Sequence, residues 1–99
     1  MELCGITCNK GEKKQVMFHP FELPVELPAT MICGKKEGMT LLVTTQIHAG
    51  EYNGSAASIR LAREINPEKL SGNILLFHCV NATGFWQRKR RFVPEDRAN

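Results

Sequence analysis

The sequence predicts an α/β fold with a mixed, mostly parallel sheet built around one strand–helix–strand unit. Two nearly continuous apolar runs, 39–45 and 73–80, are typical of strands buried on both faces. Between them lies one stretch of helical periodicity, 54–65. This order favours two parallel strands joined by a right-handed crossover. With 99 residues, the chain has room for one small domain or part of a larger one.

The N-terminal third is expected to contribute two short strands, at 15–18 and 30–33. Three prolines punctuate the stretch between and around them and discourage a helix there. They are Pro20, Pro24 and Pro28. The glycine-bounded segment 34–38 predicts a polar turn that leads into the first long strand.

The helix is expected to begin after Asn53, whose side-chain oxygen can accept a hydrogen bond from the first free amides. Pro67 disfavours helical backbone in the residue before it, so the helix should end there. The face predicted to pack on the sheet consists of Ala57, Leu61 and Ile65.

Composition and charge favour an ordinary soluble protein without a membrane span. The chain is 42% hydrophobic and 23% charged, and no apolar run approaches the roughly 20 residues that cross a bilayer. The net charge of +3 is mild and comes largely from the basic cluster 88–91, so it says little about nucleic acid. The first residues lack the basic start and apolar core of a signal peptide, and we therefore expect a cytoplasmic protein.

The four cysteines lack the paired spacing of a common metal or redox motif and are expected to be free thiols. Cys33 and Cys79 lie in apolar runs and should pack as small hydrophobic residues. A metal or redox role for Cys4 and Cys8 remains an alternative with a non-standard spacing.

The most informative motif is His48-Ala-Gly-Glu51, which directly follows the first long strand. The carboxyl ends of strands are where α/β sheets place their sites. Zinc accepts both imidazole nitrogen and carboxylate oxygen, at about 2.0–2.2 Å. Its spacing alone is more typical of a surface turn with an unpaired His and Glu, but its place at the end of a buried strand favours a metal pair.

Further motifs follow in a specific order between about residue 27 and residue 99. After the His-x-x-Glu pair come a helix of the form Gly-x-x-Ala-x-x-x-Leu-Ala, a Pro-Glu-Lys-Leu-Ser-Gly segment, and a second strand ending in Asn81-Ala82. An arginine and a Pro-Glu-Asp-x-x-Asn stretch close the series. This order resembles the zinc-dependent succinylglutamate desuccinylase/aspartoacylase family, a branch of the zinc carboxypeptidase-like fold. Ala49 and Ala82 stand where the family usually has Gly and Pro.

The resemblance implies roles for individual residues. His48 and Glu51 would bind zinc, and Arg91 would stabilise the oxyanion or the substrate carboxylate, with Arg88 and Arg90 as alternative matches. Asn99 would open a substrate-binding motif. The family's third zinc ligand, a His, and its general-base Glu come later than residue 99. The chain therefore resembles the N-terminal part of one catalytic domain of this family.

The implied activity is hydrolysis of the amide bond of an N-acyl amino acid or a similar small amide. A non-catalytic fragment or pseudo-enzyme domain that acts as a binding or assembly module is the alternative. A third possibility is nucleic-acid stacking on Phe85 and Trp86 beside the basic cluster, which predicts salt-dependent binding. We expect a small-molecule substrate rather than a nucleic-acid or membrane partner.

Two further expectations concern neighbours of the predicted site. His78 lies inside an apolar run and is expected to be a packed core residue, and His19 a loop residue, rather than metal ligands. Because both long strands need cover on both faces, we expect the chain to form an oligomer or to associate with the remainder of its domain.

Overall fold

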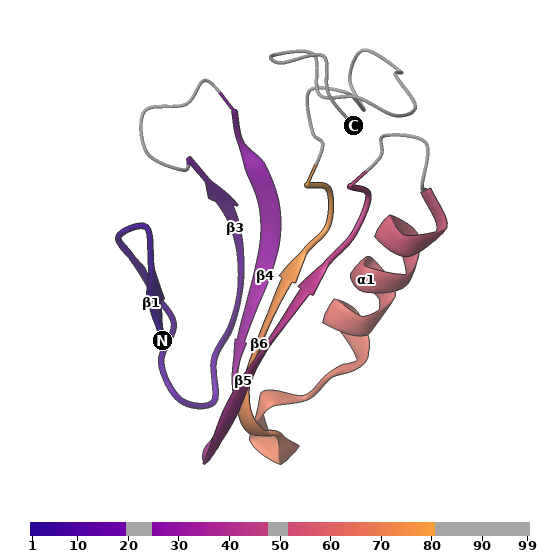
Figure 1. The fold of residues 1–99 in the computed structure, drawn as a ribbon. Helices are drawn as coiled ribbons and strands as arrows, with labels where there is room; N and C mark the ends of the chain where they lie inside the picture. The colour runs from indigo at the N-terminus through magenta and orange to yellow at the C-terminus, as the bar shows by residue number, and fades with distance from the viewer. Residues whose placement is uncertain (20–24, 48–51, 81–99) are drawn as a thin grey trace.

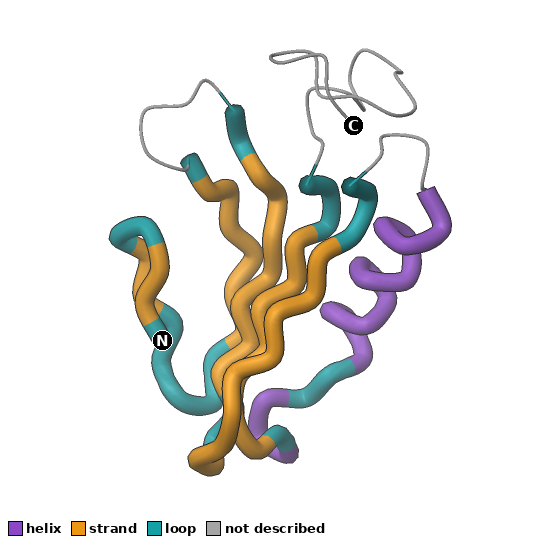
Figure 2. Tube along the Cα trace, viewed as in Figure 1, coloured by secondary structure: helices purple, strands orange, loops and turns teal. Residues whose placement is uncertain are grey.

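The computed structural model describes residues 1–19, 25–47 and 52–80 (Figure 1). A small β1–β2 hairpin precedes a four-stranded sheet in the order β3-β4-β6-β5, and one helix, α1, packs on the sheet (Figure 2). The elements are β1 (Glu2–Leu3), β2 (Ile6–Thr7), β3 (Lys13–Phe18), β4 (Leu27–Cys33), β5 (Lys36–Thr44), α1 (Tyr52–Glu64), the 3-10 helix η1 (Pro67–Lys69) and β6 (Ser71–Phe77).

The sheet confirms the predicted β-α-β unit and corrects the predicted strand directions. β5 and β6 are parallel and are connected through α1, as expected. The pairs β3–β4 and β4–β6 are both antiparallel, so the sheet is mostly antiparallel rather than mostly parallel. The cause is the short connection between β4 and β5, which reverses the chain. Because β6 then inserts between them parallel to β5, it must run antiparallel to β4.

The predicted polar turn at 34–38 is shorter than expected, since β5 already begins at Lys36. Its glycines serve close packing of strands instead. A Cβ atom on Gly34 would lie 2.4 Å from the carbonyl oxygen of Gly72, and one on Gly38 would lie 2.7 Å from the amide nitrogen of Gly72. The register shift between Lys36 and Thr40 accommodates this approach.

The two long strands differ in burial. The interior strand β6 lies between β4 and β5, and its Leu75 and Leu76 are buried, as predicted for a strand covered on both faces. β5 is the edge of the described sheet, and the prediction that it is buried on both faces is wrong for this part of the chain. Met39, Leu41 and Leu42 expose 89%, 58% and 58% of their surface. A strand is buried on both faces only when other elements cover it, and an apolar run in the sequence does not show whether such elements are present.

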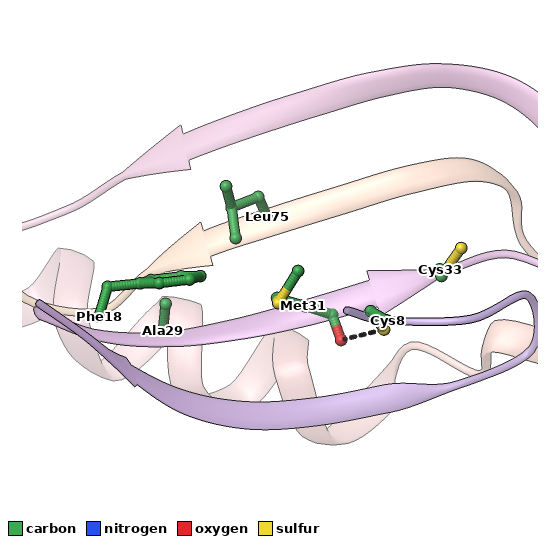
Figure 3. Close-up of a cluster of buried hydrophobic side chains, with 6 residues drawn as sticks. All are labelled: Cys8, Phe18, Ala29, Met31, Cys33 and Leu75. Atoms are coloured by element: carbon green, nitrogen blue, oxygen red, sulfur yellow. Dashed lines mark hydrogen bonds between the residues drawn. The ribbon is translucent and has the colours of Figure 1, made fainter. Parts of the chain in front are cut away.

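The core consists of two clusters on opposite faces of the sheet, because successive residues of a strand point to opposite sides. On one face, Met31 and Leu75 pack with the tilted ring pair Phe18–Phe77, whose centroids are 5.6 Å apart. Figure 3 shows the buried residues of this cluster, which are Cys8, Phe18, Ala29, Met31, Cys33 and Leu75. On the other face, Ala62 of α1 packs on Ile32 and Leu76.

The helix begins and packs differently from the prediction. α1 starts at Tyr52, so Asn53 lies inside its first turn and is not the residue that precedes it. The buried side chains are Ser58 and Ala62, whereas Leu61 is 44% exposed. Serine occupies the buried face because its hydroxyl has a partner there, as described below. No helix in the described segments is long and apolar enough to span a membrane.

The helix ends as predicted, before Pro67. Asn66 precedes η1, and its side-chain oxygen accepts a hydrogen bond of 3.0 Å from the backbone amide of Glu68. Lys13 of β3 joins this end of α1 to the sheet. Its ammonium donates to the carbonyl oxygens of Ala62 and Ile65, each at 2.6 Å, where a helix leaves its last carbonyls without intrahelical partners.

Candidate functional site

The residues predicted to carry the chemistry lie outside the described residues. These are His48, Glu51, Arg91 with its alternatives Arg88 and Arg90, and Asn99. The structure does describe both flanks of the 48–51 segment. The chain enters it from β5 through residues 45–47 and leaves it into α1 at Tyr52.

The first flank is bound to the last residue of β6 and to the residues that follow it, 77–80. The backbone amide and the hydroxyl of Thr45 both donate to the carbonyl oxygen of Phe77, at 3.2 Å and 2.8 Å. The amide of Val80 donates back to the carbonyl oxygen of Thr45 at 3.0 Å. The ends of the parallel strands β5 and β6 therefore lie side by side at one edge of the sheet (Figure 2). Such an edge is where α/β folds bind ligands.

The second flank is bound to the same segment through His78. Its Nδ1 atom lies 2.7 Å from the hydroxyl oxygen of Ser58, and its Nε2 atom lies 2.8 Å from that of Thr30. The hydroxyl of Ser55 donates to the backbone carbonyl of His78. Thr30 and Ser58 are 0% and 1% exposed, so water does not replace these partners. The imidazole thus links α1 to β4 across the buried face of the helix.

The hydrogen bonds assign the tautomer of His78. Ser58 donates its hydroxyl proton to the carbonyl oxygen of Ser55 at 2.8 Å, so its oxygen accepts from Nδ1–H of the imidazole. Nε2 then accepts from the hydroxyl of Thr30. Burial lowers the pKa of His78 below its usual value, which favours this neutral form.

A serine hydroxyl bonded to a histidine also occurs in serine nucleophiles, but this pair cannot act as one. A nucleophile must touch its substrate, and Ser58 is 1% exposed beneath the helix. His78 was predicted to be a packed residue inside the second long strand; the structure instead places it one residue beyond β6, half-buried, with both ring nitrogens hydrogen-bonded. Sequence reasoning missed its hydroxyl partners. The spacing of Ser55 and Ser58 by three on a predicted helix was the available signal.

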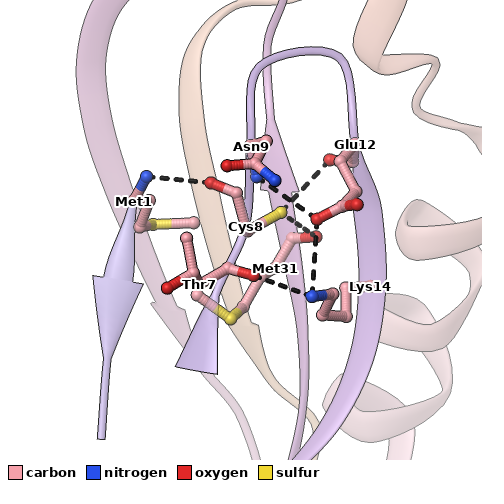
Figure 4. Close-up of polar contacts among 7 residues, drawn as sticks. All are labelled: Met1, Thr7, Cys8, Asn9, Glu12, Lys14 and Met31. Carbon is pink, nitrogen blue, oxygen red and sulfur yellow. Dashed lines mark hydrogen bonds and ion pairs between the residues drawn. The ribbon is translucent and has the colours of Figure 1, made fainter. Parts of the chain in front are cut away.

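The described segments contain no group of three or more His, Cys, Asp or Glu side chains that could hold a metal ion. The cysteine alternative gains no support from the geometry. Cys4 is exposed, whereas Cys8 is buried and its thiol donates to the carbonyl oxygens of Glu12 and Met31, at 3.3 Å and 3.6 Å (Figure 4). Burial, with a smaller contribution from Glu12, raises the pKa of the Cys8 thiol, which disfavours the thiolate that binds metals.

Cys33 and Cys79 are buried, as predicted. All four cysteines are free thiols, and none of them forms a disulfide. Burial also raises the pKa of Cys79, next to His78. The thiols of the buried cysteines therefore contribute packing rather than reactivity.

Comparison with known proteins identifies the family. The model of the succinylglutamate desuccinylase/aspartoacylase catalytic domain matches residues 37–97, more than half of the chain. The chain belongs to this family. The matched range includes the 48–51 segment and Arg91 and ends before Asn99. The resemblance inferred from the sequence motifs is thereby confirmed.

Solved structures contain a part that shares the fold of this chain. A succinylglutamate desuccinylase/aspartoacylase from Rhodobacter sphaeroides is 27% identical, with a TM-score of 0.75 over 96% of this chain. The product-bound ectoine utilization protein EutE (DoeB) from Ruegeria pomeroyi is 24% identical, with a TM-score of 0.73 over 95% of this chain, a likeness of fold. No curated protein gives a significant match.

The chain spans only part of these relatives. It covers 31% of the Rhodobacter sphaeroides chain and 30% of the Ruegeria pomeroyi chain. The described residues therefore correspond to a partial fold of the family, containing the β-α-β unit that flanks the 48–51 segment.

Proposed function

We propose that this chain supplies the zinc-binding segment of a hydrolase that cleaves the amide bond of an N-acyl amino acid or a similar small amide. The observation that carries the proposal is the family match over residues 37–97, which includes His48 and Glu51 between the end of β5 and the start of α1. We further propose that residues 1–99 form the N-terminal part of one catalytic domain and act in the cytoplasm.

The donor set and its place in the fold suit zinc. An imidazole nitrogen and a carboxylate oxygen are both zinc ligands, and catalytic zinc sites use three protein ligands with one open position. His48 and Glu51 would be two of the three. Bound zinc lowers the pKa of a water ligand to about 7 and polarises a carbonyl group.

The basic residues near the end of the chain would act on negative charge. Arg91 would hold the substrate carboxylate or the oxyanion that forms when the amide carbonyl is attacked, because its planar fork matches two oxygens. Arg88 and Arg90 are alternatives for the same role. Asn99 would contribute to substrate binding. The bound product in the solved structure of EutE (DoeB) supports a small-molecule substrate.

Catalysis would also need the family's third zinc ligand and general base, which the resemblance places later than residue 99. A second candidate function, which needs neither of them, is a binding or assembly module without catalysis. The exposed Met39, Leu41 and Leu42 on the edge strand β5 favour it, because such an edge pairs readily with another strand. The same edge would receive the remainder of a catalytic domain or a second copy of the chain.

Zinc titration of the 99-residue protein tests the proposal. We expect one zinc ion per chain and a large loss of affinity in His48→Ala and in Glu51→Gln. His19→Ala is the matched control, because His19 is a histidine at another strand end whose side chain is 60% exposed and paired with Glu26. Unchanged zinc affinity in His48→Ala would reject the proposed ligand pair.

A further inference from the structure

We propose that His78 is a positioning residue for the 48–51 segment, holding the first two turns of α1 at a fixed place relative to the end of β5. The inference rests on the function proposed above, because it takes His48 and Glu51 as zinc ligands. His78 itself is not expected to contact the metal or the substrate.

The strand side of the segment is fixed by residues 77–80. Thr45, three residues before His48, makes three hydrogen bonds with this stretch, two to the carbonyl oxygen of Phe77 and one from the amide of Val80. These bonds continue the pairing of β5 and β6 beyond Thr44, where β5 ends. The departure point of the 48–51 segment is therefore tied to residues on either side of His78.

The helix side is fixed by His78 directly. Its backbone carbonyl accepts from the hydroxyl of Ser55, four residues after Glu51, and its ring bonds to Ser58 one turn later. These are contacts of the first two turns of α1, the part of the helix nearest the predicted ligand. One residue thus holds the helix at two successive turns.

His78 is in turn anchored to β4. Its backbone amide donates to the carbonyl oxygen of Pro28 at 2.9 Å, and Nε2 of its ring bonds to Thr30, which is completely buried. Both ring nitrogens are used, one toward the helix and one toward the sheet. An apolar side chain of similar size would leave the hydroxyls of Ser58 and Thr30 buried without this partner.

The consequence concerns the spacing of the two ligands. The 48–51 segment is four residues long, and both of its flanks are bound to residues 77–80. A shift of α1 against β5 would move Tyr52, which follows this segment, relative to Ile47, which precedes it, and so would change the spacing available to the two proposed ligands. Metal sites require ligands held within about 0.5 Å of their productive positions, so such a shift weakens binding without removing a ligand.

The test compares zinc affinity with local protection in the full 99-residue protein. His78→Leu removes both ring hydrogen bonds, and His78→Gln keeps an amide that can donate and accept. Thr40→Val is the matched control, because it removes the 3.1 Å side-chain bond from Asn73 between β5 and β6 outside the His78 cluster. Zinc affinity is measured by chelator competition, and amide hydrogen exchange is measured in the metal-free protein.

We expect His78→Leu to weaken zinc binding about tenfold, the low end of the effect seen for residues that orient metal ligands. His78→Gln should recover most of this loss, and Thr40→Val should change little. In the metal-free protein, His78→Leu should speed exchange at residues 45–47 and 52–58 more than in β3 and β4. If His78→Leu does not fold, Ser58→Ala provides the same comparison with one hydrogen bond removed.

Two results would overturn the inference. One is zinc affinity unchanged in His78→Leu while overall stability falls, which would make the role of His78 purely structural. The other is exchange that rises uniformly along the chain. A wild-type protein that binds no zinc would instead reject the proposed function, and the exchange pattern would still decide whether His78 fixes the two flanks.

Discussion

Replacing Gly72 with alanine should destabilise the protein strongly, because the α-carbon of this glycine faces the backbone of β5 at close range. Its φ angle is +90°, and a Cβ atom there would lie 2.2 Å from the carbonyl oxygen of Met39. Real Cβ atoms essentially never come closer than 3.0 Å to such an atom. The contact is with backbone, so β5 itself must move and the pairing of Thr40 with Asn73 is strained.

The size of the effect follows from two costs. A left-handed backbone costs a residue with a side chain roughly 1–2 kcal/mol, and overpacking costs about 1–3 kcal/mol, giving about 2–5 kcal/mol together. A domain of this length has about 5–15 kcal/mol of stability in total. Gly72→Ala therefore removes a large share of it.

Two other glycines separate these costs. Gly5 also has a positive φ angle, +77°, but a Cβ atom there would meet nothing within 4 Å, so Gly5→Ala should cost only the backbone term of roughly 1–2 kcal/mol. Gly54 lies in α1, and its Cβ atom would make an ordinary contact of 3.6 Å with Thr45. Gly54→Ala should be neutral or stabilising by up to about 1 kcal/mol.

Urea unfolding followed by circular dichroism measures all three variants, with free energies of unfolding from linear extrapolation. The expected order of stability is Gly54→Ala, then Gly5→Ala, then Gly72→Ala. Equal stability of Gly72→Ala and Gly5→Ala would contradict this prediction, because it would show that β5 moves at this point without a cost in free energy.

Three further predictions follow from the site and the sheet edge. Because burial lowers the pKa of His78, the imidazole binds a proton more readily in the unfolded chain than in the folded one. The contribution of neutral His78 to the free energy of unfolding should therefore be complete above about pH 6.5 and be lost as the pH falls from there toward the lowered pKa. This pH dependence should be absent in His78→Gln. Light scattering should find a dimer or larger assembly that Leu41→Lys shifts toward monomer, and a sharp wild-type monomer at high concentration would contradict exposure of β5 as the cause. The purified 99-residue protein should not hydrolyse N-acyl amino acids. A general base, which the resemblance places later than residue 99, raises the rate about 10²–10⁴-fold, and two protein ligands hold zinc weakly. Zinc-dependent turnover that is abolished by His48→Ala would contradict this prediction.

Local pattern predicted the elements of the fold better than their pairing. The apolar runs and the periodic stretch between them identified β5, α1 and β6, and Pro67 marked the end of the helix region. The antiparallel placement of β4 against β6 depends on where the strand after the helix inserts, which no local pattern specifies. The exposure of β5 has the same origin, since a strand's neighbours are set by the whole sheet.

The buried face of α1 shows a second limit. Apolar periodicity selected Leu61, but Ser58 is buried instead, because His78 and the carbonyl oxygen of Ser55 satisfy its hydroxyl. A polar residue can occupy a core position when its partners are present, and those partners are distant in sequence. The metal pair itself stays a prediction from sequence and family, because His48 and Glu51 lie outside the described residues.

X-ray absorption at the zinc edge of the zinc-loaded protein shows directly which atoms bind the metal. If His48 and Glu51 are ligands, the spectrum contains only nitrogen and oxygen neighbours at about 2.0–2.2 Å, with an imidazole signal that disappears in His48→Ala. Sulfur ligands at about 2.3 Å would contradict this assignment, because they would place the metal on the cysteines instead of on His48 and Glu51.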